Sequence, residues 1–177
     1  PKTRKALFVS TLLDTSASMT GSKLAAAVEG FTDLVHHLRA HASKRMVSAP
    51  GDLVVLSTFD GEVKPQFPPL PPGKVRTGDL AKSVRAGGRT ALYDAVIEAA
   101  GRLRPTSSRV SVLVTDGADT FRGGKQSQAV DALVRACHAH VGQLQVLLLS
   151  VGTDGLSDLQ AMDQAVRRAG GRCTLRQ

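Results

Sequence analysis

The chain has 177 residues, of which 42% are hydrophobic and 21% are charged, and its formal net charge is +8 at pH 7. This length and this hydrophobic content are typical of one domain with a full core, which excludes a disordered chain. No apolar run approaches the ~20 residues that a membrane-spanning helix needs. The basic, then apolar start leads into an acidic turn without a small-residue cleavage site, so we interpret it as a first strand rather than a signal peptide.

Four apolar runs predict buried strands, because their apolar residues are nearly continuous, as in strands covered on both faces. They span residues 6–13, 53–59, 110–115 and 144–151. Apolar residues spaced three and four apart predict helices between these strands. The expected helices span residues 22–41, 91–104, 126–141 and 156–169, and a closing strand is expected over 172–175. Alternating strands and helices predict one α/β domain over 1–177, with helices on both faces of its sheet.

One expected strand departs from this alternation. Residues 62–67 follow the second strand after only Asp60 and Gly61, which is a hairpin signal, so this strand should be antiparallel. Pro65 lacks a backbone N–H and therefore places the strand at a sheet edge. The proline-rich run 65–74 contains P-x-x-P spacing. A polyproline ligand is one interpretation of this run, and a stiff surface connection is the one we prefer.

The cysteines and the basic charge give weaker indications. Cys137 and Cys173 are too few for a disulfide scaffold, which favours a reducing, cytoplasmic compartment. Cys137 lies on an apolar helical face and is expected to be a small buried residue. The basic residues are scattered along the chain and aromatics make up only 3%. A solvated basic surface is therefore a better interpretation than a nucleic-acid interface.

Two aspartates follow predicted strands at positions that suggest a shared site. Asp14 follows the first strand and Asp116 follows the strand over 110–115. In an open α/β sheet, ligands bind beyond the carboxyl ends of the strands, at the point where the strand order reverses. If the two strands are neighbours there, the carboxylates repel each other and raise each other's pKa. A bound metal cation is the simplest way to balance them.

Three hydroxyl side chains are candidate neutral ligands beside these carboxylates. Ser16 and Ser18 alternate after Asp14, and Thr90 follows two glycines just before a predicted helix. Carboxylate and hydroxyl oxygens without histidine or cysteine nearby select hard cations such as Mg²⁺, Mn²⁺ or Ca²⁺.

Three segments, DTSASM (14–19), GGRTALYDA (87–95) and VTDGADT (114–120), resemble the metal-site loops of the von Willebrand factor A domain family in sequence and order. The resemblance covers essentially the whole chain, and TALYDA is more similar to bacterial members. It implies a Rossmann-like, doubly wound, mostly parallel six-stranded sheet with one antiparallel edge strand, which fits 62–67. It also implies a metal-ion-dependent adhesion site, with Mg²⁺ as the first expectation. The implied ligands are Asp14, Ser16, Ser18, Thr90 and Asp116.

In the family, this site leaves one coordination position for an acidic side chain of a protein partner. The resemblance to bacterial members implies an AAA+ ATPase, or other domains of a larger chain, as partner. Helix capping is the alternative role for the hydroxyls: Ser18 or Thr20 is expected to cap the first helix, and Thr90 a later one. Asp94 lies one turn into that later helix, where we expect its charge to interact with the helix dipole rather than to bind a metal ion.

Other polar residues near the predicted site have two interpretations each. Asp119 and Thr120 either line the rim of the site or lie in a solvated loop. His37 and His41 have a spacing that suits a transition metal, but we expect them on a polar helix face. Four cations lie near the metal-site loops, and they either favour an acidic partner or are surface scatter. They are Arg85, Arg89, Arg122 and Lys125.

Two enzyme classes compete with a binding module. A phosphotransfer enzyme would use Asp14 as nucleophile, but Ser16 stands where a second aspartate would act as general acid. A serine hydrolase would need a G-x-S-x-G motif and a histidine near the loops, and the sequence shows neither. We therefore expect a non-catalytic, metal-dependent protein-binding module.

Overall fold

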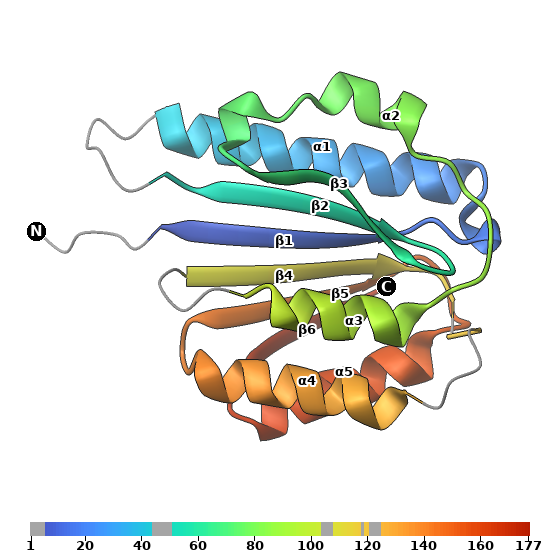
Figure 1. Cartoon of the computed structure of the whole chain (residues 1–177), viewed down its shortest axis with the longest axis vertical. Coiled ribbons are helices and arrows are strands. Elements are labelled where there is room, and N and C mark those ends of the chain that lie inside the picture. Colours follow the sequence, from blue (N-terminus) through green and yellow to red (C-terminus); the bar gives the residue numbers. More distant parts are fainter. Residues whose placement is uncertain (1–5, 44–50, 104–107, 118, 121–124) are drawn as a thin grey trace, which may run out of the picture.

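A computed structural model describes residues 6–43, 51–103, 108–117, 119–120 and 125–177. Its centre is a six-stranded sheet with the order β3-β2-β1-β4-β5-β6 (Figure 1). The strands are β1 (Leu7–Asp14), β2 (Leu53–Phe59), β3 (Val63–Leu70), β4 (Ser108–Thr115), β5 (Leu144–Ser150) and β6 (Arg172–Arg176). Neighbouring strands are parallel except for β2 and β3, which are antiparallel. The predicted fold class, with one antiparallel edge strand, is confirmed.

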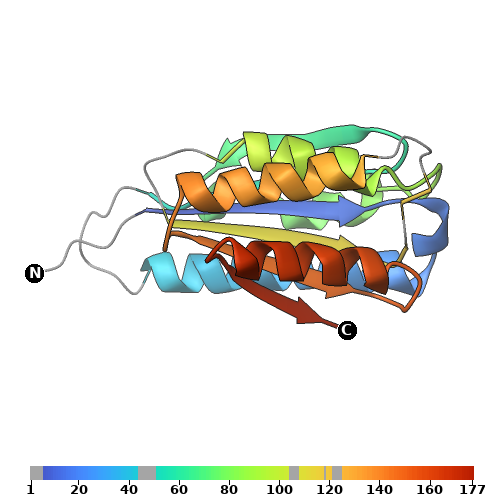
Figure 2. The same ribbon diagram turned by 90° about the horizontal axis from the view of Figure 1, so that it is seen from below.

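Helices cover both faces of this sheet, as Figures 1 and 2 show. On one face lie α1 (Ser22–Ser43) and the short α2 (Leu80–Ser83). On the other lie α3 (Leu92–Gly101), α4 (Gln126–Ala139) and α5 (Leu156–Arg168). Three 3₁₀ turns complete the described elements: η1 (Ala17–Met19), η2 (Pro72–Lys74) and η3 (Thr77–Asp79). None of the helices in the described ranges is both long and apolar enough to cross a bilayer.

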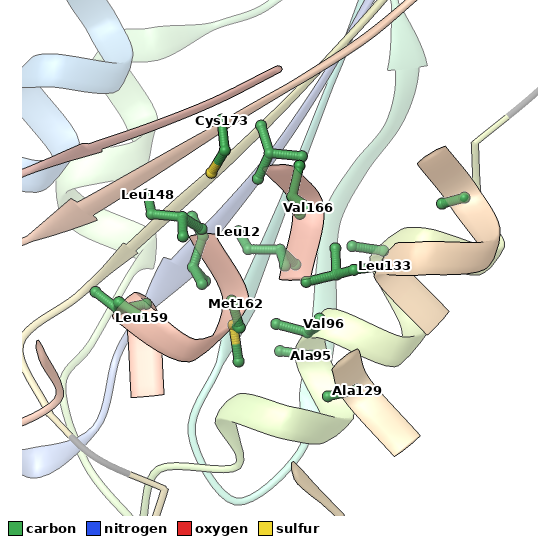
Figure 3. Packing of buried hydrophobic residues seen from close by; sticks show 14 of the residues in the cluster. Leu12, Ala95, Val96, Ala129, Leu133, Leu148, Leu159, Met162, Val166 and Cys173 are labelled. Atoms are coloured by element: carbon green, nitrogen blue, oxygen red, sulfur yellow. The ribbon is translucent and has the colours of Figure 1, made fainter. Parts of the chain in front are cut away.

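The sheet separates two apolar clusters, because side chains alternate between its faces. Leu12 of β1 faces α3, α4 and α5, where it packs among residues such as Leu133 and Met162 (Figure 3). Leu13, the next residue, packs on the opposite face with α1, where Val35 is fully buried. Burial on both faces explains why the central strands are apolar without interruption. It also holds β1 and β4 rigidly, and the candidate site lies at the ends of these two strands.

The proline-rich run is only partly a connection. β3 continues to Leu70, so Pro65, Pro68 and Pro69 lie inside it, and η2 follows. The expectation of a connection over 65–74 is therefore wrong for its first half. Prolines are tolerated here because β3 is an edge strand, and its pairing with β2 has register shifts between Val54 and Ser57.

The helices α3, α4 and α5 end earlier than periodicity predicts, whereas α1 ends two residues later, at Ser43. α4 ends at Ala139, so Val141, which the expected helix over 126–141 includes, lies beyond it and is 72% exposed. Cys137 and Cys173 are both buried and free, as expected for Cys137. Burial raises the pKa of both thiols, that of Cys173 to about 12. They are therefore unreactive core residues.

Candidate metal centre

Asp14 and Asp116 lie at the ends of two neighbouring strands. β1 pairs with β2 on one side and β4 on the other, so the strand order reverses between β1 and β4. Leu13 pairs with Val114, which brings the end of β1 beside the end of β4. Asp14 is 0% exposed and Asp116 is 2% exposed. The neighbouring placement on which the sequence argument depended is therefore confirmed, and two buried carboxylates share this edge.

The Asp14 carboxylate is fixed by hydrogen bonds on both oxygens. Its Oδ1 accepts the backbone N–H of Ser16 at 2.8 Å, and its Oδ2 accepts the hydroxyl of Thr115. Burial raises the pKa of Asp14 in spite of these hydrogen bonds, and the charge of Asp116 adds to the rise. A carboxylate in this environment is stabilised in its charged form by a nearby cation.

The first loop carries its two serine hydroxyls toward Asp116. Ser18 Oγ donates to Asp116 Oδ1 at 2.7 Å, and Ser16 Oγ lies 3.1 Å from Ser18 Oγ. The chain curls here because η1 closes a turn from Met19 N to Ser16 O at 3.0 Å, and the Met19 side chain is fully buried. The turn thereby places the Ser18 hydroxyl against the carboxylate of Asp116, which directly follows β4, with the Ser16 hydroxyl next to that of Ser18.

Hydrogen bonds join the second loop to the first. Gly87 N donates to Thr15 O at 2.7 Å, and Ala17 N donates to Gly88 O at 3.3 Å. Gly88 has a φ of +75°, and a Cβ atom there would lie 3.4 Å from the Asp60 side chain. The positive φ therefore favours glycine here, while the space at this position would admit a Cβ atom in van der Waals contact with Asp60. These contacts fix the approach of the second loop to the site.

Thr90 is held between the second and third loops. Its side chain is 3% exposed, its N–H donates to Thr120 Oγ1 at 2.9 Å, and its carbonyl accepts Thr120 N at 3.0 Å. A Cβ atom on Gly117 would lie 3.8 Å from both Thr90 Oγ1 and Ser18 Oγ. Glycine at this position thus leaves space between hydroxyls of the other two loops. All three loops therefore meet at this edge of the sheet.

Capping of α3 comes from another residue than predicted. The residue before the helix, Ala91, makes no side-chain cap, whereas Asp119 Oδ2 accepts the N–H of Tyr93 at 3.0 Å from the third loop. Asp119 and Thr120 therefore position the second loop. Asp94 lies in the first turn of α3, as expected for a dipole role, and binds Lys125 at 2.6 Å.

Ser18 and Thr20 also differ from the expected capping role. The hydroxyl of Ser18 donates to Asp116, and that of Thr20 donates to the Ala17 carbonyl at 2.6 Å. These bonds stabilise the first loop and its contact with β4. They do not satisfy the first N–H groups of α1. The prediction that Ser18 or Thr20 caps this helix is therefore wrong.

Lys23 reaches the candidate site from α1, a contact that the sequence pattern did not predict. It lies in the first turn of α1, and its Nζ forms an ion pair with Asp116 Oδ2. The hydrogen bond with Asp116 raises the pKa of Lys23, and the charges of Asp154 and Asp14 act in the same direction. A cation at a helix N-terminus opposes the helix dipole. That unfavourable placement is the sequence signal that could have drawn attention to Lys23.

The basic side chains that the sequence places near the candidate loops differ in their surroundings. Arg85 and Arg89 are exposed near the second loop, whereas Lys125 pairs with Asp94. Arg122 lies outside the described residues. The His37 side chain is exposed, as expected for a polar face, and its Nδ1 lies 2.9 Å from the Asp33 carbonyl oxygen. The side chain of His41 is not among those that the structure describes.

The donor set fits a hard divalent cation. In the described part of the chain, no group of three or more His, Cys, Asp or Glu residues forms a metal site. The converging oxygens are instead two carboxylates and three hydroxyls, the ligands that Mg²⁺, Mn²⁺ and Ca²⁺ accept. Two buried carboxylates of like charge also need a positive charge between them.

The sequence matches no family profile and no curated protein. Solved structures do match. A von Willebrand factor type A structure from Catenulispora acidiphila has a TM-score of 0.69 at 19% identity, over 98% of this chain and 39% of that one. The PilB minor pilin from Streptococcus sanguinis has a TM-score of 0.71 at 12% identity, over 99% of this chain and 58% of that one.

A third similar structure is proximal thread matrix protein 1 from the mussel byssus with a zinc-occupied MIDAS motif. Its TM-score is 0.65 at 18% identity, over 90% of this chain and 39% of that one. This chain thus spans less than two thirds of each of these three proteins. At these identities the likeness shows the fold, which is of the von Willebrand factor A type.

Proposed function

We propose that this chain is a metal-dependent protein-binding module of the von Willebrand factor A type. The observation that carries the proposal is the convergence of two buried carboxylates and three hydroxyls at the point where the strand order reverses. The zinc-occupied motif in a protein of the same fold supports it. The proposed ligands are Asp14, Ser16, Ser18, Thr90 and Asp116.

A divalent cation at this site, with Mg²⁺ or Mn²⁺ as our first choices, would supply a Lewis-acidic centre. The residues of this chain hold and orient it: Asp14 and Asp116 balance its charge, and the hydroxyls of Ser16, Ser18 and Thr90 offer neutral oxygens. Thr115 and Thr120 hold two of these ligands in place through the hydrogen bonds with Asp14 and Thr90.

The partner we propose is a protein that presents an Asp or Glu side chain, because a carboxylate is a hard, anionic ligand for such an ion. Exposed Arg85 and Arg89 favour an acidic partner further. A groove of about 560 Å³ between α1 and residues 77–86 begins at Thr20 and Gly21, next to the first loop, and gives the partner a surface to contact. An AAA+ ATPase and a further domain of a longer chain both suit this description.

The decisive experiment measures the affinity of a captured partner in Mg²⁺ and in EDTA, at several salt concentrations. The chain carries Asp14→Ala in one arm and Asp33→Ala, on the exposed face of α1, in a matched control arm. EDTA and Asp14→Ala should both weaken binding steeply, and salt should weaken it modestly. A steep salt dependence without an EDTA effect is the result expected for a nucleic-acid ligand, through counterion release, and it would overturn the proposal.

A further inference from the structure

We propose that Lys23 is a tethered cation that competes with the divalent ion for Asp116 and thereby sets the metal affinity of the site. This inference rests on the proposed metal site. It concerns a side chain outside the five ligands, which reaches the site from the first turn of α1. The ammonium and the ion would both bind the carboxylate of Asp116, so binding of one opposes binding of the other.

The hydrogen bonds of Asp116 are the first observation that supports this competition. Its Oδ1 accepts Ser18 Oγ at 2.7 Å, and its Oδ2 is bonded to Lys23 Nζ. Both oxygens therefore already have partners from this chain, and the side chain is only 1% exposed. A metal ion that binds Oδ2 must displace the ammonium, because the buried carboxylate has little other space around it.

The balance of charges at the site is the second observation that supports it. The ammonium neutralises one of the two negative charges of Asp14 and Asp116, and a divalent ion neutralises both. An ion at the site also repels Lys23 directly. The Lys23 side chain is 41% exposed, so the displaced ammonium can move into water while its methylene groups stay on the surface. The N-terminus of α1 then no longer holds a cation against the helix dipole.

The test is a calorimetric titration of the folded chain with Mn²⁺, comparing wild type, Lys23→Met and Lys74→Met. Lys74 is exposed in η2, beside Arg39 near the far end of α1, so its replacement removes the same charge away from the site. Lys23→Met should bind Mn²⁺ about two- to fivefold more tightly than wild type, the range expected for removal of a partly exposed ion pair. Lys74→Met should bind as wild type does.

A second measurement follows the ammonium itself. Acetylation of Lys23 by a small anhydride, read by mass spectrometry, should be faster in Mn²⁺ than in EDTA, whereas acetylation of Lys74 should not change. In Asp116→Ala, Lys23 should react quickly under both conditions. Lys23→Gln repeats the titration with a polar side chain, and thermal unfolding in EDTA verifies that each variant is folded.

The outcomes separate this inference from the proposed function. If wild type and Lys23→Met bind Mn²⁺ equally, the metal site stands and the competition is wrong. If only Lys23→Met binds, the competition is stronger than we expect and the inference holds. If neither binds, both proposals fail. Equal acetylation of Lys23 in Mn²⁺ and EDTA, with wild type binding the ion, would also overturn the inference.

Discussion

Thr115 donates its hydroxyl to Asp14 across the junction of β4 and β1, so the last residues of two neighbouring strands fix each other. Both side chains are fully buried. The hydrogen bond, together with the one from Ser16 N, sets the direction of the Asp14 carboxylate within the rigid part of the fold. A carboxylate held in this way has its direction fixed in advance, which would favour the binding of an ion.

Replacement of Thr115 by the similarly shaped valine should therefore weaken metal binding. Asp14 would lose the hydrogen bond on its Oδ2 and would be less firmly oriented, and we expect about a tenfold loss of Mn²⁺ affinity, as for other residues that orient metal ligands. Calorimetric titration measures the change. Thr174→Val, in the edge strand β6, is the matched control and should bind as wild type does. An unchanged affinity for Thr115→Val would show that this hydrogen bond does not prepare the site.

Removal of a carboxylate ligand should have a larger effect. Asp116→Ala takes away an oxygen donor and half of the negative charge that balances the ion, so we expect at least about a hundredfold loss of Mn²⁺ affinity. Asp33→Ala, on the exposed face of α1, controls for the change in net charge. If Asp116→Ala and Asp33→Ala bind Mn²⁺ alike, the ligand assignment is wrong.

The chain should not hydrolyse phosphate esters. Ser16 stands two residues after Asp14, where a general acid would be needed, and a serine hydroxyl does not supply a proton at neutral pH. p-Nitrophenyl phosphate in the presence of Mg²⁺ is a suitable substrate for the assay. Turnover that disappears in Asp14→Asn, but persists in Asp33→Asn, would contradict a purely binding role.

His140 should make the stability of the fold depend on pH. Burial lowers the pKa of His140 below its usual 6.5, and the nearby charge of Arg109 lowers it further. The unfolded chain therefore binds the proton more tightly, so the contribution of His140 to stability is present above pH 6.5 and is lost as the pH falls toward the lowered pKa. Thermal unfolding of wild type and His140→Gln between pH 7.5 and 5.5 tests this.

As the pH falls, the thermal unfolding midpoint of wild type should decrease more than that of His140→Gln. The control is His37→Gln, because His37 is exposed on α1, and its curve should follow that of wild type. A difference between wild type and His140→Gln that stays constant over this pH range would show that His140 is not a buried neutral group.

The predictable parts of this molecule are those that local sequence determines. Continuous apolar runs predicted the central strands, and the hairpin at Asp60 and Gly61 with Pro65 predicted an antiparallel edge strand. The carboxylates could be placed because carboxyl ends of parallel strands meet at one edge of a sheet. The sequence pattern did not indicate the end of α4, since Val141 has the right spacing but follows the last helical turn.

The contacts that complete the site are long-range, and residue spacing does not indicate them. Lys23 lies 93 residues from Asp116, and Thr115 lies 101 residues from Asp14. Such pairs depend on how α1 and β4 dock on β1, which periodicity does not describe. The role of Asp119 as a cap for α3 was missed for the same reason, because the cap comes from another loop.

Gly171, directly before β6, should be the most sensitive of the described glycines to the addition of a methyl group. A Cβ atom on Gly171 would lie 2.8 Å from Cys137 Sγ, 2.8 Å from Val166 Cγ1 and 3.0 Å from the Val166 carbonyl oxygen. These neighbours are buried core atoms and backbone, so they have little freedom to move. Gly171→Ala should lower the free energy of unfolding by about 1–3 kcal/mol, as other overpacking changes do.

Gly30→Ala is the matched control for that change. Gly30 lies inside α1, and a Cβ atom there would meet nothing within 4 Å. Alanine reduces the entropy of the unfolded chain and has the higher helix propensity, so this variant should gain about 0.5–1 kcal/mol. Urea unfolding of both variants measures the two changes, which should have opposite signs. A Gly171→Ala variant as stable as wild type would mean that β6 and α5 can move apart without cost, which contradicts the close packing of Gly171 against Cys137 and Val166.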